Sequence, residues 1–215
     1  MTKAPPTPTQ RSTYRHGDLR RALLAAGIEL ARAGGPDAVV LREATRRAGV
    51  APNAAYRHFA SRQALLQAVR AAALSAVARA MEAELAALPP KLPPADFARA
   101  SVRAIGTGYL RFAQAETGLF RTAFAASGPL PQGAPDPATA GQSGLNPFEL
   151  LNAALDRLVQ AGVMPPERRP GAEFLAWSAV HGLAMLVIDG PLGSVLGPQM
   201  AQVGQRLLDM VEKGL

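Results

Sequence analysis

The chain of 215 residues contains no cysteine. Disulfide bonds and thiolate sites, whether metal sites or nucleophiles, are therefore excluded. Histidine is also scarce, and its three residues, His16, His58 and His181, fall in different predicted elements. No nucleophile, base and acid stand at a catalytic spacing around them, and there is no glycine-rich phosphate loop. We therefore expect neither an enzyme nor a metal site, and no cofactor.

Long hydrophobic runs are missing as well. The stretch from Met1 to Arg11 has prolines and threonines where a signal peptide would be apolar. The longest nearly apolar run, Phe174 to Ile188, has 15 residues and includes a histidine, whereas roughly 20 apolar residues are needed to cross a bilayer. This run predicts a buried helix in a cytoplasmic protein with no membrane partner.

β-Branched residues are few outside short clusters, whereas alanine and leucine are abundant and hydrophobic residues make up 48% of the chain. Such a composition favours helices over sheet in a globular protein. The length suits a small domain joined to a larger one. The sequence therefore predicts an all-α fold.

The positive charge is concentrated at one end of the chain. Residues 1–70 hold 12 Lys and Arg against 4 Asp and Glu, a net charge of +8, while residues 71–215 hold 11 against 12, a net charge of −1. A basic segment attached to a neutral body is typical of a module that binds a polyanion. A merely soluble basic surface is an equally good reading of the charge alone.

Apolar periodicity, caps and breakers divide the chain into about nine helices. The first begins near Asp18, an N-cap-type residue, and ends at the Gly-Gly-Pro sequence that follows Ala33. The others are expected at about 41–47, 51–57, 61–85, 95–114, 119–124, 147–161, 171–188 and 194–212. Residues 1–13 are expected to form a flexible basic arm, and Ser127 to Pro147 a long loop.

The segment around Gly49 predicts a helix-turn-helix. Gly49 suits a left-handed turn, and Pro52 suits the first position of the short helix that follows. Asn53 then lies in the first turn of that helix, where its amide can pair with adenine and contribute about 1–3 kcal/mol of base discrimination. Pro52 and Ala54 flank it on the base-reading surface. A solvated polar residue is the alternative for Asn53.

Candidate phosphate contacts follow, where a short helix would leave the groove and pass the sugar-phosphate backbone. The side chains of Tyr56, Arg57 and His58 can donate hydrogen bonds to phosphate. Arg62 can join the N-terminal amides of the next helix in gripping a phosphate. Arg46 is a weaker candidate, for which a solvated charge is the default. For Tyr56, packing of the ring on the small core is almost as good an interpretation, and both roles can hold.

Residues 14–70 resemble the DNA-binding domain of the tetracycline-repressor (TetR) family. The resemblance rests on Tyr14-Arg15-His16-Gly17-Asp18-Leu19-Arg20, Leu41 to Val50, Tyr56-Arg57-His58-Phe59 and Leu65-Leu66. Trp177-Ser-Ala-Val-His181-Gly182 also resembles an element of one TetR subfamily. These likenesses imply a bacterial, homodimeric transcriptional regulator, usually a repressor, that a small molecule releases from its operator. The chain would then divide into an arm (1–13), a helix-turn-helix domain (14–60) and a helical ligand-binding and dimerisation domain (61–215).

This chain departs from the family pattern where two helices begin. Val40 stands where Ser or Thr often caps the second helix, and Ala51 where Ser or Thr commonly opens the recognition helix. Ala44 and Thr45 replace a branched aliphatic residue and an alanine. Each lost cap costs on the order of 1 kcal/mol. We therefore expect a less stable helix-turn-helix, and no phosphate contact from the side chain of Ala51.

Most aromatic residues fall after residue 90 and could line an apolar ligand pocket. For any single one of them, a place in the helical core is the more ordinary role. Trp177 and His181 are four residues apart and share a helix face, where the imidazole needs a hydrogen-bond partner. This partner is either a ligand or, slightly favoured, a neighbouring carbonyl. The candidate ligand-binding residues are Phe97, Tyr109, Phe112, Phe124, Trp177 and His181.

The last two predicted helices, 171–188 and 194–212, are apolar round much of their circumference, and Ser178, Gly182 and Gly204 permit close approach. The resemblance implies that they form a four-helix interface with a second copy. A dimer places two recognition helices ~34–36 Å apart and predicts a pseudo-palindromic operator in double-stranded DNA.

A different function remains open at this stage. The basic N-terminus and apolar C-terminal half would also suit a cationic carrier of lipids or small molecules that does not bind DNA specifically. That alternative does not explain why Pro52, Asn53 and Tyr56 lie just beyond Gly49 in a short helix.

Overall fold

The structure is a computed structural model that describes residues 16–125 and 136–215. Within these ranges every regular element is a helix, and ten of them are α-helices. They are α1 (His16–Gly34), α2 (Leu41–Arg47), α3 (Pro52–Ala55), α4 (Arg62–Ala86), α5 (Pro94–Ala115), α6 (Thr117–Phe124), α7 (Pro147–Gln160), α8 (Ala172–Ile188), α9 (Gly193–Leu196) and α10 (Met200–Gly214). The all-α prediction is confirmed, with one helix more than expected.

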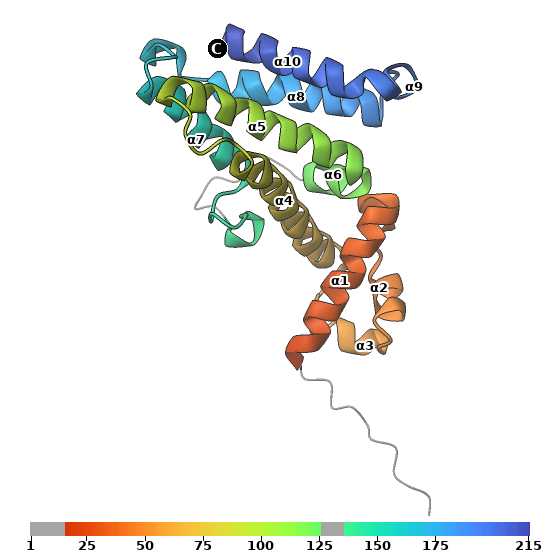
Figure 1. Ribbon diagram of the computed structural model, residues 1–215. Helices are drawn as coiled ribbons and strands as arrows, with labels where there is room; N and C mark the ends of the chain where they lie inside the picture. Colours follow the sequence, from red (N-terminus) through yellow and green to blue (C-terminus); the bar gives the residue numbers. More distant parts are fainter. Residues whose placement is uncertain (1–15, 126–135) are drawn as a thin grey trace, which may run out of the picture.

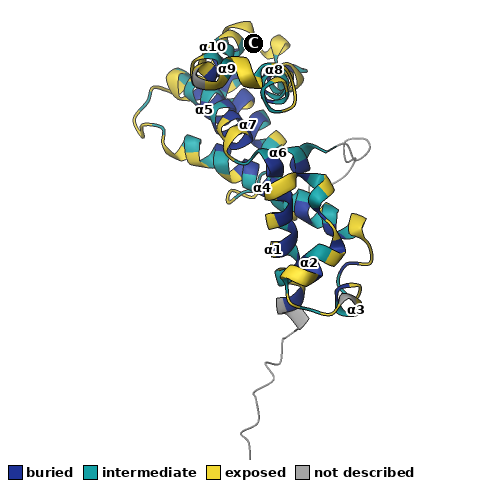
Figure 2. Ribbon diagram, turned by 90° about the vertical axis from the view of Figure 1, so that its right-hand side faces the viewer, coloured by how far each residue is buried: buried dark blue, intermediate teal, exposed yellow. Residues whose placement is uncertain are grey.

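The first three helices form a small lobe at one end of an elongated molecule (Figure 1). Leu23, Ala44, Ala55 and Phe59 lie in its core and are at most 3% exposed. Figure 2 shows the buried residues of α1 and α2 on the sides that face inward. The predicted helix-turn-helix core is therefore present, and it leaves the outer sides of α2 and α3 to solvent.

Helix α4 joins this lobe to the rest of the molecule (Figure 1). Ser61 caps its start by accepting a hydrogen bond from the backbone N–H of Ala64 at 3.1 Å. By length and composition alone α4 could span a membrane. Its apolar side chains instead pack against α1, α5, α6 and α7, and Leu65, Val69 and Val77 are fully buried. This helix therefore makes contacts on more than one side.

The larger domain stacks its helices around α5, which packs against α4 on one side and against α8 and α10 on the other (Figure 1). Two glycines of α5 permit this close packing. A Cβ atom on Gly108 would lie 2.6 Å from both the carbonyl oxygen of Ala80 and the Cα of Met81 in α4. A Cβ atom on Gly106 would overlap the side chain of Leu208 in α10. The atoms that face Gly108 are therefore backbone, whereas those that face Gly106 belong to a leucine side chain.

The prediction of a single helix at 194–212 is wrong. The short helix α9 and the longer α10 occupy these residues, with a 3-10 turn at Gly197–Gln199 between them. Pro198 has no N–H to continue the helical hydrogen-bond ladder, and glycine is a weak helix former, so the helix breaks at this point. A 3-10 turn at Pro36–Ala38 also precedes α2, where the sequence predicted only the end of the first helix.

The predicted arm, 1–13, lies outside the described residues, and so do residues 127–135 of the predicted loop. The part of that loop that the structure describes is held against α4. It contains a 3-10 turn at Pro137–Thr139, and the carboxylate of Glu82 accepts hydrogen bonds at 2.8 Å from the backbone N–H groups of Gln142 and Ser143. This stretch lacks long helices but is fixed by specific contacts.

Candidate functional site

A tight turn joins α2 to α3. Gly49 has a φ angle of 67°, the left-handed conformation predicted for it. Neither Val40 before α2 nor Ala51 before α3 supplies a side-chain cap. The hydroxyl of Thr45, which is buried in α2, donates to the carbonyl of Arg42 at 2.6 Å. The departures from the family pattern are thus accommodated without an unpaired hydroxyl in this helix.

The predicted DNA-contacting residues of α3 and the turn after it lie at the outer end of the small lobe (Figure 1). Asn53, Tyr56 and Arg57 are exposed, whereas Ala54 and His58 are half-buried. Tyr56 is 58% exposed, so its ring does not serve the core, which Ala55 and Phe59 fill instead. The side chain of Pro52 lies outside the described part of the chain. These residues form one accessible surface, and their contacts with DNA stay a prediction.

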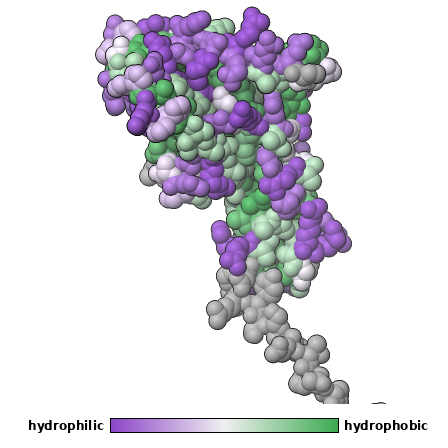
Figure 3. All heavy atoms as spheres, viewed as in Figure 1, coloured by the Kyte–Doolittle hydropathy of each residue, from purple (hydrophilic) through white to green (hydrophobic). Residues whose placement is uncertain are grey.

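Arg46 of α2 shares a carboxylate with its neighbour Arg47. The Arg46 guanidinium donates to the two oxygens of Glu43 at 2.9 and 2.6 Å, and Nε of Arg47 donates to one of them at 3.2 Å. These hydrogen bonds, that of Arg46 first, lower the pKa of Glu43 to about 2. Figure 3 shows hydrophilic residues gathered over α2. The three charges orient Arg46 at the surface and leave a net positive charge beside α3.

Arg62 occupies a place that the sequence did not predict. Its Nε donates to the carbonyl of Val39 at 2.8 Å and its Nη2 to the carbonyl of Pro36 at 3.0 Å, and the carboxylate of Asp37 lies 3.7 Å away. These acceptors belong to the 3-10 turn and the residues leading into α2. Arg62 therefore ties the start of α4 to the start of the helix-turn-helix, and a phosphate contact from it stays a prediction.

We expect the substitution Arg62→Ala to lower the free energy of unfolding by about 1 kcal/mol, because it removes the hydrogen bonds to the backbone carbonyls of Val39 and Pro36 and a longer one to that of Asp37. A chain of this size should then melt about 2–4 °C lower in a thermal denaturation. Arg57→Ala is the matched control, since this exposed side chain makes no hydrogen bond or ion pair among the described residues, and its melting temperature should not change. If Arg62→Ala melts like the wild type but flattens the salt dependence of DNA binding, its role is phosphate contact instead.

The larger domain contains an aromatic cluster made of Tyr109, Phe120, Phe124, Trp177 and His181. They come from α5, α6 and α8, and the centroids of their contacting rings lie 4.8–6.3 Å apart. Tyr109 and Phe120 are buried, whereas Phe124, Trp177 and His181 are only partly buried. The cluster therefore has a closed floor and an accessible side. Phe148 extends it from α7, with its ring 6.0 Å from that of Trp177.

A chain of hydrogen bonds runs through the aromatic cluster. The indole N–H of Trp177 donates to the hydroxyl of Tyr109 at 3.2 Å, and the same hydroxyl lies 2.7 Å from Nδ1 of His181. Burial raises the pKa of Tyr109 and lowers that of His181. The favoured expectation that a carbonyl would satisfy the imidazole is wrong, because the partner is a tyrosine that lies 72 residues away in the chain.

Four of the six predicted ligand-binding residues meet in the aromatic cluster, and two do not. Phe97 is 38% exposed near the start of α5, and Phe112 is buried elsewhere along the same helix. Neither ring contacts the cluster within the ranges that the structure describes. Phe120 was not among the candidates, although its spacing of four residues from Phe124 would place both on one face of a helix. A ligand role for any of these residues stays a prediction.

Helix α6, which carries Phe120 and Phe124, is also fixed to the small lobe. A Cβ atom on Gly118 would overlap the backbone of α1 at Arg32. Nε of Arg32 donates to the carboxylate of Glu116 at 2.7 Å. At the other end of α6, Nε of Arg121 donates to Asp189 after α8 at 2.7 Å. Helix α6, which forms one side of the aromatic cluster, therefore contacts the end of α1, the first helix of the helix-turn-helix domain.

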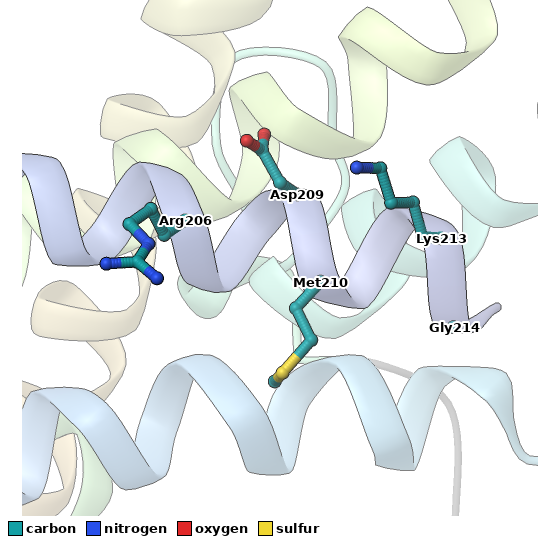
Figure 4. A pocket seen from close by; sticks show the side chains of 5 residues that line it. All are labelled: Arg206, Asp209, Met210, Lys213 and Gly214. Carbon is teal, nitrogen blue, oxygen red and sulfur yellow. The ribbon is translucent and has the colours of Figure 1, made fainter.

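A shallow hollow of about 570 Å³ lies on α10, away from the residues of the aromatic cluster. It is lined by Arg206, Asp209, Met210, Lys213 and Gly214 (Figure 4). In that view Met210 points toward α8 and Asp209 toward α5. Asp209 forms an ion pair with Arg103 of α5, whereas Met210 is 61% exposed. The hollow thus exposes apolar surface at the seam between the last two long helices.

Comparison with known families gives matches in both domains. Residues 23–69 match the profile described as "Bacterial regulatory proteins, tetR family". Residues 102–211 match the profile described as "Tetracyclin repressor-like, C-terminal domain". No curated protein matches the chain.

Solved structures of similar shape cover nearly the whole chain. A protein of unknown function from Rhodococcus sp. RHA1 is 27% identical with a TM-score of 0.72, covering 95% of this chain and 99% of its own. A single-residue variant of TetR from Acinetobacter baumannii, in complex with minocycline, is 19% identical with a TM-score of 0.59, covering 91% of each chain. The TetR family transcriptional regulator PfmR from Thermus thermophilus is 19% identical with a TM-score of 0.54, covering 90% of this chain and 98% of its own. The last two share the fold.

Proposed function

The chain belongs to the TetR family of bacterial regulatory proteins, and from this premise we propose that it is a dimeric repressor, released from a pseudo-palindromic operator by a small apolar effector. One observation carries the proposal. Asn53, Tyr56 and Arg57 are exposed together at the outer end of the small lobe. A helix-turn-helix of this kind places its second helix in the major groove, with side chains near its N-terminus on the base edges.

The roles of these residues follow from their chemistry. Asn53 offers an amide that can both donate to and accept from adenine. Tyr56, Arg57 and Arg46 offer donors to phosphate, which position the protein without reading sequence. We assign the DNA-reading unit to residues 14–60 and the effector and dimer functions to residues 61–215. The protein would act in the cytoplasm and would carry out no catalysis.

The dimer interface that we propose is built on α8 and α10. Leu175, Ser178, Gly182 and Leu186 of α8 are spaced to share one face, and Leu175 is 68% exposed. A Cβ atom on Gly182 would meet nothing within 4 Å. Leu175 and Leu186 are thus exposed apolar side chains on one face of α8, and exposed apolar surface of this kind supports an interaction surface. Gly204, which the sequence offered for the same interface, is buried within α10 and lies next to Leu110 of α5 instead.

Replacing both Leu175 and Leu186 with glutamate should convert the dimer to a monomer, because each interface would then bury four unpaired carboxylates. Light scattering after size exclusion should report half the wild-type mass. Operator affinity should fall by orders of magnitude, since one recognition helix then binds alone. Val40→Glu is the matched control, because Val40 is an exposed apolar residue outside this face, and its mass should stay dimeric. A double variant that keeps the dimer mass would place the interface elsewhere.

The effector site that we propose is the aromatic cluster, and α6 would carry the signal. An apolar molecule that inserts between Phe124 and Trp177 would displace α6, which packs without a gap on α1 through Gly118. The displacement would change how the helix-turn-helix domains are held in the dimer. An effector can shift this equilibrium only as far as it prefers the released state.

The proposed function is tested with a duplex from the region upstream of the protein's own gene. Binding should show a steep salt dependence and a sequence preference that survives at higher salt. Anionic lipid vesicles serve as the alternative partner, which a cationic carrier protein would prefer. Equal affinity for every duplex, or affinity for DNA no higher than for vesicles, would overturn the proposal.

A further inference from the structure

The hydrogen bonds of the aromatic cluster determine where its protons lie. The indole of Trp177 is a donor only, so the Tyr109 oxygen accepts that proton. The hydroxyl proton of Tyr109 then has one acceptor within reach, Nδ1 of His181 at 2.7 Å. An imidazole that accepts at Nδ1 carries its own proton on Nε2 when neutral. The direction of donation therefore runs from Trp177 through Tyr109 to His181.

Within the described ranges, this arrangement leaves one donor without a partner in the protein. Among the residues that the structure describes, Nε2 of His181 makes no hydrogen bond. The ring stands between Phe120 at 5.8 Å, Phe124 at 5.1 Å and Trp177 at 5.9 Å, measured between centroids. It is only partly buried, so the N–H lies on the accessible side of an apolar cluster. On this accessible side the donor is available either to water or to an acceptor on a bound molecule.

The charges around the aromatic cluster indicate which kind of molecule it would bind. The cluster consists of aromatic rings, and burial lowers the pKa of His181 and so favours the neutral imidazole. The nearest basic side chain of α6, Arg121, is occupied by Asp189 and by the carbonyl of Ile188 at 3.1 Å. A charged ligand would lose its hydration without gaining a counter-ion here. The site therefore favours a neutral molecule.

We infer that the effector is a neutral, flat, apolar molecule with a hydrogen-bond acceptor, such as a ketone or ester oxygen, that receives the Nε2–H of His181 while its body packs against Phe124 and Trp177. The inference rests on the proposed function in one respect, that the aromatic cluster is the effector site. Tyr109 is then a positioning residue. It fixes the proton of His181 and does not itself contact the ligand.

The first test uses the protein without any ligand. Nitrogen-15 NMR of the histidine rings should show His181 neutral at pH 7, with its proton on Nε2, and the signal is assigned by its loss in His181→Gln. In Tyr109→Phe the preference for this tautomer should weaken, because Nδ1 of His181 then has no hydroxyl from which to accept a hydrogen bond. A proton on Nδ1 in the wild type would overturn the inference whatever the protein does with DNA.

The second test compares two probes of nearly equal shape, acetophenone and α-methylstyrene, which differ by an oxygen acceptor in place of a methylene group. Binding is followed by the indole N–H resonance of Trp177, the one tryptophan in the chain. Acetophenone should bind about five- to tenfold more tightly, the effect of one hydrogen bond to the partly buried N–H of His181. In His181→Phe this preference for acetophenone over α-methylstyrene should be lost, and in His16→Gln it should be unchanged.

The possible outcomes separate the inference from the proposed function. Equal affinities for the two probes would overturn the acceptor requirement but keep the cluster as a site for apolar molecules. No shift of the indole resonance with either probe, up to its solubility limit, would overturn both the inference and the cluster as effector site. Operator binding, measured separately, would be untouched by either result.

Discussion

Replacing Asn53 with alanine should lower affinity for the operator by about 30-fold or more while leaving affinity for unrelated DNA unchanged. A bidentate contact between an amide and adenine contributes about 1–3 kcal/mol of discrimination, and a dimer makes that contact twice. The side chain is exposed on α3 and has no hydrogen-bond partner among the described residues, so its removal costs the folded protein little. Fluorescence anisotropy with an operator duplex and a scrambled duplex, at several salt concentrations, measures both affinities.

Two results would give Asn53 a different role. If affinity for both duplexes falls together and the salt slope flattens, Asn53 contacts phosphate. If the melting temperature falls as well, it supports the fold of α3. Gln160→Ala, an exposed amide at the end of α7, is the matched control and should change neither affinity.

The substitution Gly108→Ala should lower the free energy of unfolding by about 2 kcal/mol. The added methyl group would lie 2.6 Å from the backbone of α4 at Ala80 and Met81, and a helix backbone cannot move aside without opening the α4–α5 interface. Because the methyl group would meet backbone atoms, the cost should lie at the upper end of the ~1–3 kcal/mol that is typical of overpacking. The gain of at most about 1 kcal/mol when alanine replaces glycine in a helix offsets part of this cost. A thermal denaturation should show a drop of about 4–8 °C.

The neighbouring position supplies a matched control. Gly106→Ala also adds a methyl group on α5, but it meets the end of the Leu208 side chain, which can rotate away. Its melting temperature should change much less than that of Gly108→Ala. If the two variants melt alike, the packing of α5 on α4 tolerates a side chain, and the close approach at Gly108 is not what holds these helices together.

Local signals in the sequence predicted most helices of this fold. The buried face of α1, the cap at Ser61 and the left-handed turn at Gly49 each follow from residues within a few positions of one another, and each is present. The break at Gly197 was missed, because apolar residues at helical spacing continue on both sides of it. A breaker is easily overlooked when periodicity alone is followed across it.

The candidate site was less predictable, because its contacts join distant parts of the chain. Arg62 donates to a carbonyl 23 residues away, and Tyr109 meets His181 across 72 residues. Side-chain chemistry indicated that His181 needs a partner, but nothing in its own helix could identify a tyrosine on α5. Similarly, the positive charge of Arg46 indicated a DNA contact. Helical spacing permits its pairing with Glu43 but does not require it, because the pairing also depends on the rotamers of both side chains.

Selection of binding sites from a pool of random duplexes tests the central claim most directly, that a dimer reads DNA through α3. The wild-type protein should enrich a pseudo-palindrome whose half-sites are one helical turn apart, ~34–36 Å between centres. Asn53→Ala should relax the preference at one symmetric pair of positions and leave the others intact. Enrichment of no sequence, or of a site without two-fold symmetry, would contradict the account.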